Sequence, residues 1–390
     1  GTQYLQMGKT LYDNESVYHE AIDACAQLLL EDLSVDIREI IFADSGLDAA
    51  QEALNNTRFT QPALFITEYA LSQLWISWGI QPTLLCGHSV GEFVAAHLAG
   101  VLSLKDALHI VASRGRLVNE LPGGSMLSVR LSEKELLDIL PTSLSIAAVN
   151  SKQLCVVSGT DLAIDNFAKT LETKNIAHRV LLTSHAFHSS MMDPMLDAFE
   201  AILKTVRFNT PQVPIVSTVT GTWLTDSEAT SVSYWVNHVK NTVRFADALD
   251  NIIDLEDAIL LEVGPGKSLT TLAHQQAAGK PLEAFASRTL SKENSQNEYD
   301  TVLNALGELW LRGVNPDWKA FYNQQQRQKI NLPSYVFDRK PCWIEPINNK
   351  TSNSISDEGQ KQTDNSVSVT PITENIEFDP FSGPEVEYII

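Results

Sequence analysis

The sequence predicts an α/β protein in which a smaller α/β unit is inserted into a larger one, and three observations lead to this prediction. Short apolar runs alternate with amphipathic helical patterns along most of the chain. Residues 84–100 have the pattern of a strand, a sharp turn bounded by glycines and a helix. Residues 125–182 have a separate rhythm of short strands and helices.

The strand–turn–helix segment begins with the apolar run Leu84-Leu85-Cys86. After the turn the pattern is helical from Val90 to Leu98, and Gly100 ends the helix. Ser103 and Asp106 are spaced as in a helix cap, which predicts a further helix to about Glu120.

The inserted unit alternates strands and helices in the order βαββαβ. The expected elements are strand 125–131, helix 132–140, strand 144–150, strand 153–159, helix 161–174 and strand 177–182. This order is the ferredoxin-like pattern.

From about Thr351 the composition changes to small polar and acidic residues. Residues 351–390 contain eight acids and one lysine, and such a segment cannot offset its ordering entropy by burial. We expect a solvated linker. The alternative is that its last apolar residues, Phe378, Phe381 and 386–390, dock or begin a following domain.

The composition excludes several classes of protein. A net charge of −20 argues against broad affinity for nucleic acid, so an anionic ligand needs local cations. The four cysteines are scattered without a CxxC pair, which argues against a disulfide framework and structural zinc. The sequence contains no apolar run of the ~20 residues that a membrane span needs, and its first residues are not those of a secretory leader. We expect a globular cytoplasmic protein.

Gly87-His88-Ser89-Val90-Gly91 fits the pattern G-x-S-x-G of a nucleophile turn in an α/β-hydrolase-like core. In such a turn the serine hydroxyl is exposed above the sheet, and the N–H of Val90, at the start of the helix, can donate to an oxyanion. The alternative is that Ser89 is only the N-cap of a helix.

A nucleophilic serine needs a base, and the segment Ser184-His185-Ala186-Phe187-His188-Ser189 is well placed because it follows the last strand of the inserted unit. The pattern alone does not choose between His185 and His188, and either can be an ordinary surface histidine. No acid stands out between Ser89 and His188, so we expect a dyad oriented by another acceptor.

Six motifs occur in the order seen in malonyl-CoA:acyl-carrier-protein transacylases. The chain resembles most closely the acyltransferase domain of type I modular polyketide synthases, over roughly residues 1–345. The motifs are Gly87-His88-Ser89-Val90-Gly91-Glu92, Arg114-Gly115-Arg116-Leu117, Ala148-Val149-Asn150-Ser151, His185-Ala186-Phe187-His188-Ser189, Asn241-Thr242-Val243-Arg244-Phe245 and Glu262-Val263-Gly264-Pro265-Gly266.

The resemblance implies a role for each matching position. Ser89 is the acylated nucleophile, His188 the base, and the backbone carbonyl of Asn241 orients that base. Arg114 pairs with the malonyl carboxylate, for which a guanidinium is well suited, and Gln61 lines the acyl site. The alternative for Arg114 is one more solvated cation on a helix.

Three further residues are assigned to the site. Phe187 accompanies malonyl selection in the resembling family, and Val90 is of the apolar type that does the same. A phenylalanine ring would fill the volume that an α-methyl branch needs. The alternative is that Phe187 packs between the two subdomains and selectivity is set elsewhere. We also place His88 among the substrate-binding residues.

The resemblance also predicts the domain organisation. A large hydrolase-like subdomain comprises residues 1–122 and 189–290, and a ferredoxin-like subdomain comprises residues 123–188. Residues 291–348 are a post-acyltransferase linker segment and residues 349–390 an acidic disordered linker. The family's first strand and its Gly-Gln-Gly glutamine, a second oxyanion donor, would precede Gly1.

The expected function is transfer of a malonyl unit from malonyl-CoA to an acyl carrier protein in polyketide biosynthesis, beside a ketosynthase and other megasynthase domains. No metal and no bound cofactor are expected. Cations such as Lys152, Arg116 or Arg244 should contact the anionic carrier. The alternatives are a serine hydrolase or editing thioesterase, and a catalytically silent docking domain.

Overall fold

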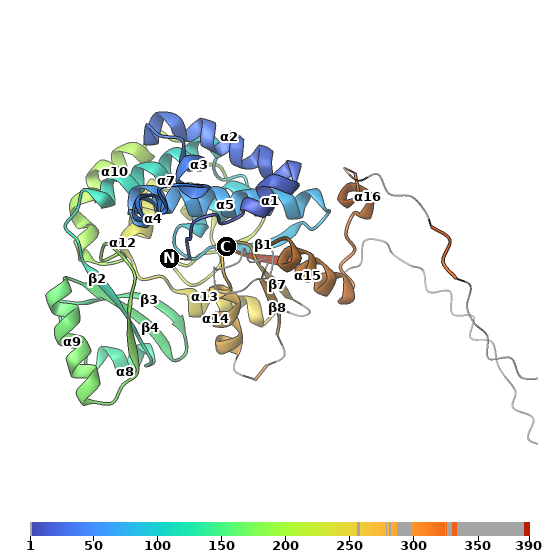
Figure 1. Cartoon of the computed structure of the whole chain (residues 1–390). Helices are drawn as coiled ribbons and strands as arrows, with labels where there is room; N and C mark the ends of the chain where they lie inside the picture. Colours follow the sequence, from blue (N-terminus) through green and yellow to red (C-terminus); the bar gives the residue numbers. More distant parts are fainter. Residues whose placement is uncertain are drawn as a thin grey trace, which may run out of the picture. The chain divides into compact units, whose positions relative to one another are not determined.

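The computed structural model describes residues 2–255, 258–277, 279–280, 282–286, 298–323, 325, 330–333 and 386–390. By its internal contacts the chain divides into two compact units, Gly1–Asn323 with Gly383–Ile390, and Gln324–Ser382. Both sheets and the helices around them belong to the first unit (Figure 1).

The large subdomain is built on a five-stranded parallel sheet with the strand order β6-β1-β9-β7-β8. Its strands are β1 (Pro82–Cys86), β6 (Ile215–Val216), β7 (Ile259–Glu262), β8 (Glu283–Ala286) and β9 (Val386–Ile389). The central strands are apolar and buried on both faces, as in parallel sheets covered by helices. The predicted α/β class is therefore confirmed.

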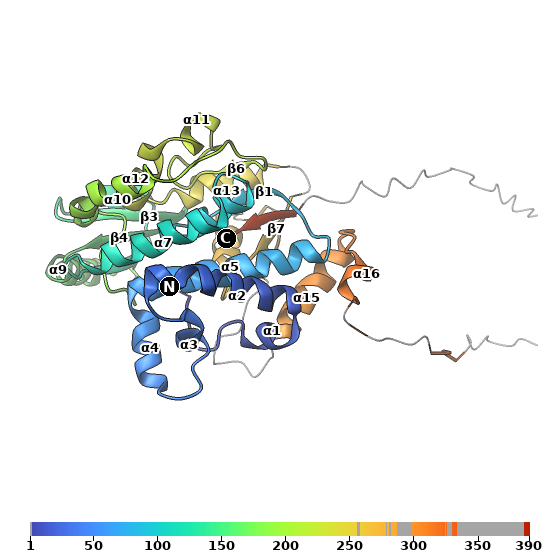
Figure 2. The same cartoon turned by 90° about the horizontal axis from the view of Figure 1, so that it is seen from above.

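Helices surround this sheet, and α2, α5 and α7 pack against one another in one layer (Figure 2). Helix α5 is buried along most of its length because apolar residues occupy nearly every face. The helices of this subdomain are α1 (Lys9–Asn14), α2 (Ser16–Leu33), α3 (Ile37–Ile41), α4 (Leu47–Asn55), α5 (Thr57–Ser77), α6 (Gly91–Leu98), α7 (Leu104–Asn119), the 3₁₀ helix η1 (Ser190–Met195), α10 (Leu196–Leu203), α11 (Asp226–Ala229), α12 (Val232–Lys240), α13 (Phe245–Ile253) and α14 (Ser268–Ala277).

The small subdomain has the predicted βαββαβ order. Its antiparallel sheet has the order β3-β4-β2-β5, and its apolar core, with Leu127 and Phe167, lies between the sheet and its helices. Each expected element is present, and no end differs from the prediction by more than three residues. The elements are β2 (Ser125–Val129), α8 (Glu133–Leu137), β3 (Ser145–Ser151), β4 (Leu154–Gly159), α9 (Asp161–Thr173) and β5 (His178–Leu181).

The linker prediction is wrong for residues 386–390, and the alternative, that these residues dock, is confirmed. Strand β9 lies between β1 and β7 and pairs with both, and the Tyr388 hydroxyl donates to the Ile80 carbonyl at 2.7 Å. The linker was predicted from the composition averaged over 40 residues, and this average did not reveal that four apolar side chains at the end can be buried. These four side chains are at most 3% exposed in the structure. The large subdomain was also expected to lack a strand, yet β9 makes its sheet continuous. Residues 351–385 lie outside the described residues.

The boundary predicted at residue 290 is also displaced. Helices α15 (Glu298–Leu311) and α16 (Trp318–Phe321) belong to the first unit, which continues to Asn323. The Glu298 carboxylate is buried and accepts hydrogen bonds from the N–H groups of Gly8 and Thr10 and from the Tyr4 hydroxyl. A buried carboxylate with several donors fixes α15 against the start of the chain.

Candidate active site

Ser89 lies in a tight turn between β1 and α6 and has a backbone φ of 54°. A Cβ atom at Gly87 would lie 2.2 Å from the Glu92 nitrogen, and one at Gly91 would lie 2.2 Å from the Ile390 carbonyl oxygen. Only glycine fits at these two positions, which explains the G-x-S-x-G spacing. The N-cap of α6 is Val90, not Ser89, and the Ser89 hydroxyl contacts His188 and Arg114 instead. The N–H groups of Gly91 and Glu92 donate to the carbonyls of His88 and Ser89, which leaves the N–H of Val90 next to the Ser89 hydroxyl as the oxyanion donor of this turn.

His188 is in hydrogen-bond contact with this serine. Its Nε2 lies 2.8 Å from Ser89 Oγ, and its Nδ1 lies 2.9 Å from the Asn241 carbonyl oxygen. A carbonyl can only accept, so Nδ1 carries the proton and Nε2 is free to accept one from Ser89. His185 faces the Leu121 carbonyl and Ser184 instead. The structure thus separates two histidines between which the pattern of residues could not choose.

Burial keeps His188 neutral. The side chain is 5% exposed, and desolvation, followed by the charges of Arg114 and His88, lowers its pKa to about 3, while the hydrogen bond to Asn241 acts in the opposite direction. His188 also has a left-handed backbone, with a φ of 55°. Two strained residues facing each other are the arrangement found at reactive sites.

Arg114 extends from α7 toward the same serine. The side chain is 1% exposed, Nη1 donates to Gln61 Oε1, and Nη2 lies 3.5 Å from Ser89 Oγ. Gln61 Nε2 in turn donates to Thr57 Oγ1 at 2.8 Å. A Cβ atom at Gly115 would lie 2.9 Å from the Thr57 carbonyl oxygen, so this glycine lets α7 approach α5 closely.

The guanidinium of Arg114 has no counter-ion within the described parts of the chain. It has no carboxylate partner among the residues that the structure describes, and its Nε has no hydrogen-bond acceptor there. Desolvation lowers its pKa to about 10, so the group stays charged at neutral pH. A buried unpaired cation is costly, and an anion bound beside Ser89 would offset that cost.

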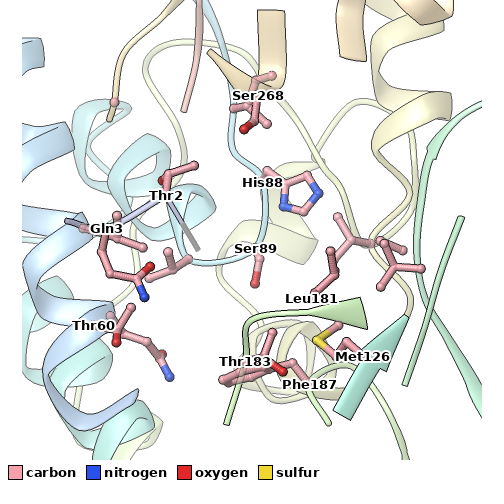
Figure 3. Close-up of a pocket in the computed structure, with 18 of the residues that line it drawn as sticks. Thr2, Gln3, Thr60, His88, Ser89, Met126, Leu181, Thr183, Phe187 and Ser268 are labelled. Carbon is pink, nitrogen blue, oxygen red and sulfur yellow. The ribbon is translucent and has the colours of Figure 1, made fainter. Parts of the chain in front are cut away.

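These side chains line a cavity of about 430 Å³ between the two subdomains. In Figure 3, Thr2, Gln3 and Thr60 lie on one side of Ser89, whereas Met126, Leu181 and Phe187 lie on the other. His88 also lines the cavity, and its Nε2 is 2.9 Å from Asn150 Oδ1. A partly open, mostly apolar cavity with a few convergent polar groups is typical of a small-molecule site.

A buried polar network behind the turn was missed by the sequence analysis. The Glu92 carboxylate accepts hydrogen bonds from the Thr218 N–H at 3.0 Å and from the Tyr234 hydroxyl, and His238 Nε2 lies 3.8 Å from it. Thr218 Oγ1 also donates to the Gly87 carbonyl, which ties the network to the turn. Burial raises the pKa of Glu92 to about 7. The available signal was Glu92 itself, an acid directly after G-x-S-x-G.

The cations expected to contact a carrier protein are already engaged. Arg116 pairs with Glu120 at 3.1 Å, and Arg244 pairs with Glu133 and Asp247 at 2.6 Å. Lys152 Nζ donates to the Gln276 carbonyl at 3.2 Å. The prediction named these residues because they are basic; Glu120 and Asp247 are close to their partners in sequence, whereas Glu133 and Gln276 come from distant parts of it.

The described part of the chain lacks two kinds of feature. No cluster of His, Cys, Asp or Glu there has the arrangement of metal ligands. None of the described helices is both long enough and apolar enough to cross a bilayer.

The comparisons with known proteins agree with this geometry. The family model described as "Acyl transferase domain" matches residues 1–316. Over 348 residues the chain is 39% identical to "Phenolphthiocerol synthesis polyketide synthase type I Pks15/1" of Mycobacterium marinum (strain ATCC BAA-535 / M), with 89% of this chain and 16% of that protein covered. The chain thus spans about a sixth of the length of this relative.

Two solved structures show the same fold. The acyltransferase domain from the second module of the salinomycin polyketide synthase is 39% identical with a TM-score of 0.77, covering 86% of this chain and 77% of that one. The malonyl CoA-acyl carrier protein transacylase from Clostridium perfringens Atcc 13124 is 25% identical with a TM-score of 0.68, covering 80% and 96%.

Proposed function

The chain belongs to the acyl transferase domain family, and on this premise we propose that it moves a malonyl group from malonyl-CoA to the phosphopantetheine thiol of an acyl carrier protein. The observation that carries the proposal is the buried guanidinium of Arg114, 3.5 Å from Ser89 Oγ and without a carboxylate partner among the described residues. The free carboxylate of a malonyl thioester would supply this missing counter-ion. An acetyl group would leave the cation unpaired.

The first half-reaction acylates Ser89. His188 Nε2 takes the hydroxyl proton as Ser89 Oγ attacks the thioester carbonyl, and the N–H of Val90 donates to the oxyanion. When the carbon–sulfur bond breaks, the proton on His188 passes to the leaving CoA thiolate. The products are malonyl-Ser89 and free CoA.

The second half-reaction is the reverse chemistry with a different thiol. The carrier's phosphopantetheine thiol gives its proton to His188, and its sulfur attacks the malonyl ester. Ser89 leaves and recovers the proton from His188. Neither half changes an oxidation state, so we propose that both proceed without a metal or redox cofactor.

Malonyl is proposed in preference to methylmalonyl because of Phe187. Its side chain is half-buried and lines the cavity beside Leu181 and Met126. A methyl branch on the acyl group would have to displace an aromatic ring from this wall, and such overpacking costs about 1–3 kcal/mol.

The proposed setting is polyketide biosynthesis, with the carrier protein, a ketosynthase and other megasynthase domains as partners. This setting is supported by the polyketide synthase named above, of which the matched region is a small part. We propose that the transferred malonyl unit extends a growing polyketide chain.

The test uses the full chain with radiolabelled malonyl-CoA and a carrier protein bearing its phosphopantetheine arm. Label is expected first on the protein, as added malonyl mass that Ser89→Ala abolishes, and then on the carrier. Exclusive release of free malonate would make the chain a hydrolase or editing thioesterase. Absence of any adduct in a folded protein would favour a silent docking domain.

A further inference from the structure

Charge is separated between the two layers of the small subdomain. Residues 123–188 contain six basic and six acidic residues, so this part is neutral in a chain of net charge −20. All six acids belong to α8 and α9 or to the residue that ends α8. The strands of the sheet contain no acid. The sheet layer is therefore the cationic side of this subdomain.

Two arginines lie on the face of the sheet that borders the cavity. Met126 pairs with Leu181, and Ser128 pairs with Arg179 in the next row of the same face. Arg130 is two residues beyond Ser128, and its N–H donates to the Ala177 carbonyl, which continues the ladder. Since side chains alternate along a strand, Arg130 and Arg179 share a face with Met126 and Leu181, which line the cavity.

The same face becomes more exposed with distance from Ser89. Met126 is 8% exposed, Ser128 is half-buried, and Arg130 and Arg179 are exposed. Arg179 is two residues from Leu181, which corresponds to about 7 Å along the strand. Arg179 therefore lies just beyond the part of this face that lines the cavity, and Arg130 is its diagonal neighbour on the adjacent strand.

Neither arginine has an ion-pair partner in the part of the chain that the structure describes. Among the described residues, no carboxylate lies within 4.0 Å of Arg130 or Arg179, and neither side chain makes a hydrogen bond. Arg116 and Arg244, by contrast, are held in ion pairs. Near the cavity on this sheet, Arg130 and Arg179 are thus available to an anion.

We propose that Arg179, with Arg130 beside it, binds the phosphate of the phosphopantetheine arm while the thioester lies at Ser89. This inference rests on the proposed function, because the arm enters the cavity only if an acyl thioester is the substrate. A guanidinium can contact two phosphate oxygens at once, which suits a site on the rim of a cavity. The same phosphate is present in malonyl-CoA and in the carrier protein, so one site would serve both half-reactions.

The test compares two donors that differ by one phosphate, malonyl-phosphopantetheine and malonyl-pantetheine. Acylation of Ser89 is followed by intact mass in the full chain and in Arg179→Ala. In Arg179→Ala, the second-order rate constant of acylation should fall about tenfold with malonyl-phosphopantetheine, which corresponds to the loss of one charge-assisted hydrogen bond. With malonyl-pantetheine it should stay unchanged. Lys169→Ala, an exposed cation on α9 in the helix layer, is the matched control and should alter neither rate.

A second measurement addresses the carrier. Transfer from malonyl-Ser89 to the carrier's arm should fall by a similar factor in Arg179→Ala, and Arg130→Ala should give a smaller loss in both assays. An equal loss with both donors would overturn the proposal, because the effect would not depend on the phosphate. A loss with malonyl-CoA but not with malonyl-phosphopantetheine would also overturn it, since the nucleotide would then be the anion. If no donor acylates Ser89, the proposed function itself fails.

Discussion

The two sheets of the molecule contribute differently to the cavity between them. The parallel sheet leads at its carboxyl ends into the Ser89 turn after β1, into Thr218 after β6 and into Gly264 after β7. The antiparallel sheet contributes Met126 and Val156, which are apolar wall residues. The nucleophile Ser89 therefore comes from the end of a parallel strand, whereas the base His188 follows β5, the last strand of the antiparallel sheet, which also supplies apolar wall residues.

The difference follows from how each sheet is covered. A parallel sheet with helices on both faces has no free face, so its polar and reactive groups gather at the strand ends. The antiparallel sheet packs one face against α8 and α9, and part of its other face borders the cavity. We expect substitutions at the Ser89 turn and at His188 to affect chemistry, and substitutions of the apolar wall residues beside the small sheet to affect selection.

Ser89→Ala should give the largest effect. Without Oγ no ester can form, and His188→Ala should slow acylation by at least about 10⁴-fold, since nucleophile and base act as one unit. Intact mass after mixing with malonyl-CoA measures both. His185→Ala is the matched control, because this side chain faces the Leu121 carbonyl. Equal losses in His185→Ala and His188→Ala would contradict the assignment of the base.

Arg114→Ala should lower malonyl loading by about 10²–10³-fold, because the substrate carboxylate would be left unpaired in a buried site. Acetyl loading should fall less, so the ratio of acetyl to malonyl rises. Direct competition between the two CoA thioesters measures this ratio. Arg114→Lys keeps the charge but loses the paired geometry and should be intermediate. A fall by the same factor for both acyl groups would make Arg114 a structural residue only.

Phe187→Ser should shift selection by roughly tenfold or more toward methylmalonyl while Ser89 is still acylated, because the enlarged wall accepts one methyl branch. Competition between malonyl-CoA and methylmalonyl-CoA measures the shift. Ser158→Ala is a useful comparison, since the Ser158 hydroxyl donates to the Phe187 carbonyl at 2.8 Å and not to the ring. An unchanged ratio in a folded protein would remove Phe187 from the selection of the acyl group.

The sequence predicted the local features of the site and missed the long-range ones. The Ser89 turn could be predicted because its glycines are adjacent in sequence, and the small subdomain because its periodicity is local. The role of Arg114 came only from resemblance, because nothing local separates a buried arginine from a solvated one. Glu92 was missed for the same reason, since its burial depends on residues more than a hundred positions away. Strand β9 was missed because its partners are equally remote.

The smallest expected effect is that of pH on acylation. It tests whether His188 is as well shielded from water during the reaction as its burial suggests. Burial, Arg114 and His88 lower the pKa of His188, so its neutral form persists well below pH 6.5. The rate constant of Ser89 acylation should therefore change less than about threefold between pH 6 and 8 if His188 alone controls it.

Glu92 is the group that can disturb this flat profile. Its pKa is raised to about 7 by burial, so Glu92 gains a negative charge behind the Ser89 turn as the pH rises through this window. Glu92→Gln removes that titration and should flatten any residual step near pH 7, while His188 keeps its lowered pKa. Arg114→Gln removes one of the charges that lower the pKa of His188, so the acidic limb of the pH–rate profile should move to higher pH. Because desolvation is the largest cause, the limb should still lie below pH 6.5. If the acidic limb of the pH–rate profile of the unmodified protein lay at pH 6.5 or above, His188 would be solvated during the reaction. The surroundings of His188 would then be as accessible to water as those of the exposed Arg179.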